Sequence, residues 1–187
     1  MSNKLSQKPV QHTDNVYNTI LITRPVSINI NNIGKGLKNT LERVLSSQFE
    51  GKCIVEGYIK KKSIKILTYS SGIVKSDHVK FDVAFECDVC MPVEGMKISC
   101  NVKNITKAGI RAELGDVDSP IVIFIARDHH DITEYFNSVS VNDTIHISVI
   151  GQRYELNDSF ISIIAELLPP QKKLKIIKKK RLINKQT

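Results

Sequence analysis

The stretch from Val79 to Gly115 decides how the rest of the chain is interpreted. It begins Val79-Lys-Phe-Asp-Val-Ala-Phe-Glu-Cys-Asp-Val-Cys-Met-Pro92, an extended pattern that ends at a proline. It continues Val93-Glu-Gly95-Met-Lys-Ile-Ser-Cys-Asn-Val-Lys-Asn-Ile-Thr-Lys-Ala-Gly109-Ile-Arg-Ala-Glu-Leu-Gly115, in which two alternating runs flank a turn. A strand, a joint marked by proline and a hairpin predict that a small β-barrel starts here, after a different domain.

The rest of the predicted barrel follows along the chain. Residues 96–104 and 108–114 alternate apolar and polar side chains, which is typical of half-buried strands, and residues 121–126 are apolar throughout. Residues 128–137 form a short helical or irregular crossover, and residues 144–151 and 160–168 complete five strands. This layout predicts an oligonucleotide-binding (OB) barrel over residues 90–169. A barrel appended to another domain is usually a binding module, which favours nucleic acid over catalysis.

Residues 16–89 predict a separate unit with one helix on an antiparallel sheet. Residues 17–26, 52–58, 63–68, 73–74 and 79–89 have strand patterns. A helix is expected between the first two, with Asn31 or Asn32 as its N-cap and an end near residues 46–48. Its apolar face consists of Ile33, Leu37, Leu41, Val44 and Leu45. The whole chain is therefore expected to be an α+β protein rich in β-structure.

The net charge of +8 is concentrated at the C-terminus. Of 27 Lys and Arg residues, eight lie in residues 170–187 without any acid, so the remaining 19 balance the 19 Asp and Glu. The folded part is neutral, and residues 170–187 are a basic tail. Residues 1–15 are polar, lack periodicity and are expected to be disordered. No stretch reaches the roughly 20 apolar residues that a membrane helix needs, so an intracellular protein is expected.

The four cysteines raise the question of a metal. Cys87 and Cys90 have the spacing of a zinc knuckle, but the sequence has no second pair at comparable spacing. Both also fall in one predicted strand, where side chains three residues apart point to opposite faces. We therefore expect reduced, packed thiols, with no metal, no cofactor and no catalytic residues. A cysteine- or zinc-dependent enzyme remains an alternative.

Several segments, taken in order, match a known family. The chain resembles the seventh, stalk subunit of eukaryotic RNA polymerase II and the E subunit of archaeal RNA polymerase, over about residues 17–168. Each segment is weak alone, but their order and spacing are fairly specific. The matching segments are Phe49-Glu-Gly51-Lys-Cys53, Gly57-Tyr58-Ile59, Ser71-Gly72-Ile-Val74, Val79-Lys-Phe-Asp-Val83, Pro92-Val-Glu-Gly95, and Gly109 to Gly115 with Arg153 in the final hairpin.

This resemblance implies a non-catalytic polymerase subunit. Its N-terminal tip domain (16–89) would dock on the large polymerase subunits and pair with a small helical partner, while the barrel faces nascent RNA. The residues assigned to docking are Gly34, Gly57, Tyr58, Ile59 and Pro92. The chain departs from the family at the joint, where Pro92-Val93-Glu94-Gly95-Met96 lacks the family's aromatic residue. The family implies a nuclear protein. The abundance of Ile, Lys and Asn is compatible with a divergent viral version, which would instead lie in a cytoplasmic virus factory and in the virion.

The basic residues of the predicted barrel are candidates for weak, sequence-independent contacts with RNA phosphates. They are Lys97, Lys103, Lys107, Arg111, Arg127 and Arg153, with Tyr154 beside the last. Few aromatic residues are available for base stacking, since the second and third barrel strands offer Ile110, Val122 and Phe124. The alternative interpretation of these cations is an ordinary solvated surface.

The tail adds the cations Lys172, Lys173, Lys178, Lys179, Lys180 and Arg181. It is expected to contact nucleic acid or a protein partner, ahead of roles as an import signal or on a membrane. The main alternative for the whole chain is a free-standing RNA-binding protein with an OB barrel, acting in RNA processing or translation.

Overall fold

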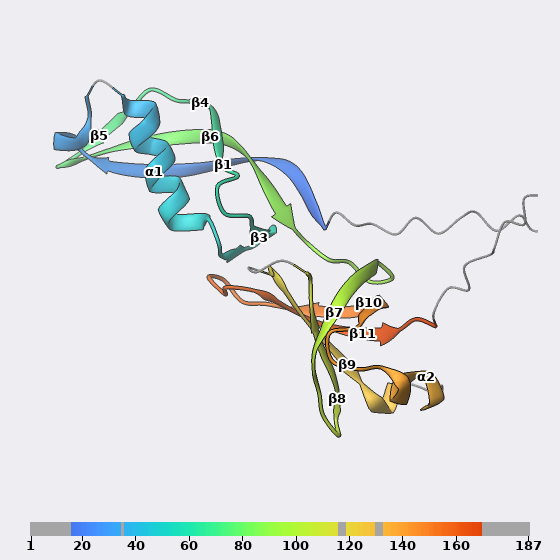
Figure 1. Cartoon of the computed structure of the whole chain (residues 1–187). Coiled ribbons are helices and arrows are strands. Elements are labelled where there is room, and N and C mark those ends of the chain that lie inside the picture. Colours follow the sequence, from blue (N-terminus) through green and yellow to red (C-terminus); the bar gives the residue numbers. More distant parts are fainter. Residues whose placement is uncertain (1–15, 35, 116–118, 130–132, 170–187) are drawn as a thin grey trace, which may run out of the picture.

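The computed structural model describes residues 16–34, 36–115, 119–129 and 133–169, and these form a β-sheet unit followed by a closed barrel (Figure 1). The sheet unit carries the long helix, so the expectation of an α+β protein rich in β-structure is confirmed. The predicted disordered N-terminus and the basic tail lie outside the described residues. Among those residues, no helix is long and apolar enough to cross a membrane.

The N-terminal sheet is organised around one long strand, β6 (His78–Cys90). Strand β1 (Tyr17–Asn29) pairs with β6 over its whole length, in antiparallel register from Tyr17 opposite Cys90 to Asn29 opposite His78. Three shorter strands pair one after another with the opposite edge of β6: β3 (Gly57–Ile59), β4 (Lys65–Tyr69) and β5 (Ile73–Lys75). Strand β2 (Cys53–Ile54) pairs with the far side of β3.

Helix α1 (Leu37–Phe49) covers one face of this sheet, and Figure 1 shows it lying across β1 and β6. The predicted apolar face is confirmed for four residues, because Leu41 and Leu45 are fully buried while Leu37 and Val44 pack at the margin of the same core. Ile33 packs against this core too, but it lies before the helix, so its placement on the helix face is wrong. The predicted N-cap is wrong. The Asn29 side chain instead accepts a hydrogen bond from the Asn31 N–H in a 3₁₀ turn (Ile30–Asn32), and α1 begins only after Gly36, whose φ of +123° interrupts the helical path.

The segment predicted as a single strand over residues 52–58 is a hairpin. It divides into β2 and β3, with Val55 and Glu56 in the turn. Gly57 explains the division, because its φ is +126° and a Cβ there would lie 2.5 Å from the Cys90 carbonyl oxygen. The turn is held by Glu56, which accepts two hydrogen bonds of 2.6 and 2.8 Å from the Arg24 guanidinium on β1.

The second unit is a closed barrel of five strands. In spatial order the strands are β10, β11, β9, β8 and β7, and β7 pairs with β10 to close the cylinder. All neighbours are antiparallel except β9 and β11, which are parallel. The predicted strands agree with β7 (Lys97–Ile105), β8 (Gly109–Glu113), β9 (Ile121–Ala126), β10 (Thr144–Arg153) and β11 (Ile161–Leu167). The crossover between β9 and β10 contains a 3₁₀ turn (Arg127–His129) and α2 (Thr133–Ser138).

The two units are joined by more than the chain between β6 and β7. The Cys53 N–H donates to the Asp158 carbonyl, and the Asn157 N–H donates back to the Cys53 carbonyl, at 2.8 and 2.9 Å. The Tyr154 hydroxyl donates to the Val55 carbonyl at 3.1 Å. These bonds tie the β2–β3 hairpin to the loop between β10 and β11. We call this set of contacts the junction.

The cysteines are buried thiols. Cys87 belongs to the core beneath α1, whereas Cys90, three residues later on the same strand, belongs to the barrel core. The opposite orientation predicted for this pair is therefore confirmed. Burial raises the pKa of Cys53 and Cys87 to about 11 and that of Cys90 and Cys100 to about 12, so all four remain protonated near neutral pH.

Candidate functional site

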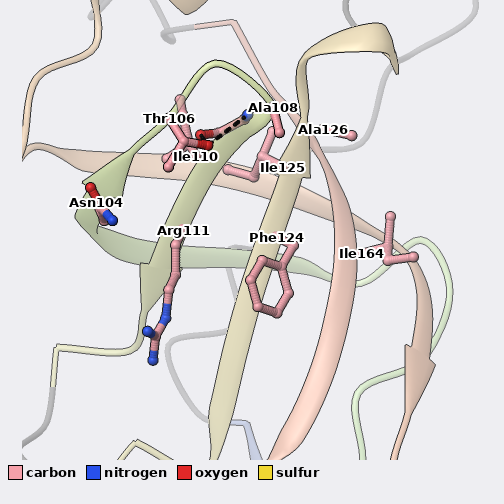
Figure 2. A pocket seen from close by; sticks show the side chains of 10 residues that line it. Asn104, Thr106, Ala108, Ile110, Arg111, Phe124, Ile125, Ala126 and Ile164 are labelled. Atoms are coloured by element: carbon pink, nitrogen blue, oxygen red, sulfur yellow. Dashed lines mark hydrogen bonds between the residues drawn. The ribbon is translucent and has the colours of Figure 1, made fainter.

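The most promising surface of the barrel is a row of side chains that crosses four adjacent strands. The register places Asn104 of β7 opposite Arg111 of β8, Arg111 opposite Phe124 of β9, and Phe124 beside Ile164 of β11. Phe124 and Ile164 are 46% and 52% exposed, which is unusual for large apolar side chains on neighbouring strands. Figure 2 shows the Phe124 ring between Arg111 and Ile164.

A cavity of about 460 Å³ opens along this row, and we call it the barrel pocket. Most of its wall is apolar. The lining residues are Asn104, Thr106, Ala108, Gly109, Ile110, Arg111, Phe124, Ile125, Ala126 and Ile164. Within the pocket Gly109 and Ala126 face each other across β8 and β9, and both add little or no side-chain bulk to its wall. A Cβ at residue 109 would lie 2.2 Å from the Ile125 carbonyl oxygen, so the close approach of the strands requires glycine.

The turn between β7 and β8 forms one end of the pocket and is firmly held. The Thr106 N–H and hydroxyl both donate to the Gly109 carbonyl, at 2.8 and 3.1 Å. Arg127 supports the turn from the crossover side, because its Nε donates to the Lys107 carbonyl at 3.1 Å. The same guanidinium donates to the Asn137 side chain and lies 4.7 Å from the centroid of the Phe136 ring. Arg127 thus has a clear structural role.

Three of the predicted RNA-contact residues lie along this edge of the pocket. Lys103 and Lys107 are exposed on β7 and in the turn, next to the lining residues Asn104, Thr106 and Ala108. Arg111 lies in the row itself and forms a 3.1 Å ion pair with Glu113 on the same strand. Its side chain remains 51% exposed, so the guanidinium is still accessible to a ligand.

The other predicted RNA contacts are elsewhere on the barrel. Lys97 is half-buried at the start of β7, opposite Ser148 of β10. Arg153 is highly exposed, with Glu155 at 3.6 Å. Tyr154 belongs to the junction, where partial burial raises the pKa of its hydroxyl. Of the seven predicted residues, Arg111 lines the barrel pocket, and Lys103 and Lys107 are exposed next to lining residues in the sequence.

The residues predicted to dock on other subunits are mostly internal. Gly57, Tyr58 and Ile59 are buried beside β6, and Pro92 is buried at the joint. Gly34 is exposed before α1. Tyr58 packs into the barrel core and Ile59 into the core beneath α1, and the docking role of these residues stays a prediction. The predicted tail cations Lys172, Lys173, Lys178, Lys179, Lys180 and Arg181 lie outside the described residues.

A second, more polar cavity of about 340 Å³ lies between the two units. Arg111 lines both cavities, so they are neighbours on the surface. The sheet unit contributes Gly51, Tyr58 and Lys61, and the barrel contributes Arg111, Glu113, Ser119, Val122, Ser159 and Phe160. Cations and a half-exposed Phe160 ring are thus available beyond the first pocket.

Phe124 is the functional candidate that sequence analysis undervalued. Ile121, Ile123 and Ile125 point into the barrel and are buried, so Phe124 must point outward. A continuous apolar run conceals this alternation, because outward and inward residues have the same polarity. The β-branched isoleucines at alternate positions were the available signal. Ile110, considered with Phe124 as a base contact, is buried and lies in the floor of the pocket.

These features define a small β-barrel with a basic edge and an apolar pocket, attached to a helix-covered sheet. The chain is 26% identical over 148 residues to a putative DNA-directed RNA polymerase subunit of Acanthamoeba polyphaga mimivirus. The alignment covers 71% of this chain and 72% of that protein. No protein-family model matches the chain. The similarity extends over most of both chains, so the two proteins are related along most of their length.

Proposed function

We propose that this chain is a non-catalytic stalk subunit of a multisubunit DNA-dependent RNA polymerase. The observation that carries the proposal is the similarity to the mimivirus polymerase subunit. The 148 aligned residues are more than either the sheet unit or the barrel contains, so the similarity extends over both. The partners of such a subunit are the large polymerase subunits and a small helical protein.

The order of the barrel strands supports an OB fold in this proposal. Numbered along the chain, the barrel strands run first, second, third, fifth and fourth around the cylinder, and the third and fifth are parallel. OB barrels bind their ligands on the face of the second and third strands and with the adjoining loops. Here these strands are β8 and β9, which carry Arg111 and Phe124. The sheet unit with α1 would then be the tip domain that docks on the polymerase.

Nascent RNA is the proposed ligand of the basic edge. Lys103, Lys107 and Arg111 supply cations that attract phosphates without reading the sequence. Lys61 in the second cavity and exposed Arg153 add further positive charge. Two half-exposed phenylalanine rings among the described barrel residues, Phe124 and Phe160, limit stacking to about two bases. Weak binding that is sensitive to salt and tolerant of sequence follows from this composition.

The test is affinity purification of the tagged full chain from infected or native cells at moderate salt. The proposal expects large polymerase subunits and one small helical protein in the eluate. Recovery should be unchanged when Lys103, Lys107 and Arg111 are replaced by alanine, because docking is assigned to the other unit. RNA or ribosomal proteins without polymerase subunits would refute the stalk role and favour a free-standing RNA-binding protein.

A further inference from the structure

The composition of the barrel pocket does not match the ligand proposed for its edge. Its wall is mostly carbon, and its floor is formed by buried Ile110 and Ile125. Two of the polar groups that reach it are engaged, since the Thr106 hydroxyl bonds within its turn and Arg111 pairs with Glu113, which leaves the Asn104 amide and the exposed part of the Arg111 guanidinium at its edge. A nucleobase seated there would lose water from several donors and acceptors on its edges and regain few hydrogen bonds. An apolar side chain seated there gives up no hydrogen bonds to water.

The charges around the pocket are unevenly distributed. Lys103, Lys107 and Arg111 lie along the edge formed by β7, the turn and β8. On the opposite edge, β11 carries exposed Glu166 two residues after Ile164 and on the same face. A ligand in the pocket therefore experiences a positive edge on one side and a negative charge on the other.

We propose that the barrel pocket binds a segment of another protein through one large apolar side chain, with acidic residues of that segment on the Lys103–Lys107–Arg111 edge. Phe124 and Ile164 would form the walls around the anchoring side chain, because they are exposed and adjacent. The chain's own C-terminal tail is a poor occupant, because its eight cations and lack of acids would repel that edge.

This inference rests on the described barrel and does not require that the chain be a polymerase subunit. It does share three cations with the proposed RNA contact. Binding of the acidic segment and binding of RNA at this edge should therefore compete. Such competition distinguishes one shared surface from two independent surfaces.

The experiment is selection of a random phage-displayed peptide library on the immobilised full chain, with parallel selection on Ile164→Thr. Because Ile164 is half-exposed, the variant should fold, and circular dichroism checks this. The enriched peptides should share Leu, Ile or Phe followed or preceded by Asp and Glu. Their affinity should fall about tenfold or more in Ile164→Thr and Phe124→Ala. The control Leu21→Thr, at a 65% exposed position of β1, should have no effect.

Three results would overturn the proposal. The first is that no peptide is enriched on the wild type relative to Ile164→Thr, or that the enriched peptides are basic. The second is that a short oligouridine loses affinity in Phe124→Ala and Ile164→Thr although no peptide is enriched, which would make the pocket a base site. The third is a wild-type dimer in light scattering that Ile164→Thr dissociates, which would make a second copy the occupant. If the affinity purification recovered no polymerase subunits, the peptide, oligouridine and light-scattering measurements would still test the pocket on their own.

Discussion

Replacing Gly109 by alanine should both destabilise the barrel and damage its pocket. The added Cβ would lie 2.2 Å from the Ile125 carbonyl oxygen and 3.2 Å from the Ala126 Cα. Both contacts are with the backbone of β9, which cannot rotate away as a side chain would. The two strands must separate, and this strains the pairing of Gly109 with Ala126 and of Ile110 with Ile125.

The expected cost is of the order found for overpacked cores, about 1–3 kcal/mol in the free energy of unfolding. It is measured by urea denaturation monitored by circular dichroism. The slope of the free energy of unfolding against urea concentration shows whether the unfolded state has changed. Gly151→Ala is the matched control, because Gly151 also lies in a barrel strand and a Cβ there has no neighbour within 4 Å. That variant should be neutral or more stable by about 0.5–1 kcal/mol, since alanine lowers the entropy of the unfolded chain.

The result that would refute the reasoning is equal stability of Gly109→Ala and Gly151→Ala. Strands β8 and β9 would then separate without a loss in the free energy of unfolding, and their close approach would not be what shapes the pocket. A loss of stability in both variants would be equally damaging, because it would show a general intolerance of alanine in the barrel. Peptide binding measured on folded Gly109→Ala should also fall, because the two strands that line the pocket must separate to admit the methyl group.

Three further predictions concern charge, the junction and the thiols. Replacing Lys103, Lys107 and Arg111 by alanine should reduce the magnitude of the slope of log affinity against log salt for single-stranded RNA by about 2, because three phosphate contacts are lost. An unchanged slope would argue against RNA binding at this edge. An equal effect of replacing the exposed control residues Lys38, Arg43 and Lys75 would argue against it too. Tyr154→Phe should destabilise by about 0.5–1.5 kcal/mol in urea, since the Val55 carbonyl loses its donor, and wild-type stability would show that water replaces it. Because burial raises the pKa of Cys100 from 9.0 to about 12, the contribution of its protonated thiol to stability is complete below pH 9 and is lost as pH rises toward 12. Cys100→Ala should therefore reduce the fall in the free energy of unfolding across this range. An unaltered dependence of that free energy on pH would assign the fall to other groups.

Four of the five barrel strands were predictable because their buried positions alternate with outward ones, whereas β9 was predictable as a short apolar run. In β7, Ile98, Cys100 and Val102 are buried between polar neighbours, and that alternation is visible in the sequence. The apolar face of α1 was predictable for a similar reason, because its buried residues recur at the spacing of a helical turn. Local patterns of this kind depend only on which side of one element is buried.

What could not be predicted depends on contacts between elements that are distant in the sequence. The division of residues 52–58 into a hairpin follows from the approach of Gly57 to the Cys90 carbonyl, which no local pattern records. The start of α1 depends on a 3₁₀ turn tied to the rest of the sheet, since the Ile30 N–H donates to the Asp77 carbonyl. The pocket likewise requires β7, β8, β9 and β11 to be in register, so its residues are scattered from Asn104 to Ile164.

The junction connects the proposed docking unit to the proposed ligand surface. Its two backbone hydrogen bonds, between Cys53 and the loop of Asn157 and Asp158, resist shear because both partners are main chain. Tyr154 adds a third bond, and Tyr58 of β3 packs into the barrel core itself. A sheet unit held on a polymerase would therefore fix the orientation of β8 and β9, and with them the direction in which Arg111 and Phe124 face. On the proposed function, the pocket would then present its ligand at a defined place relative to the transcript, which a flexible tether between the two units would not achieve.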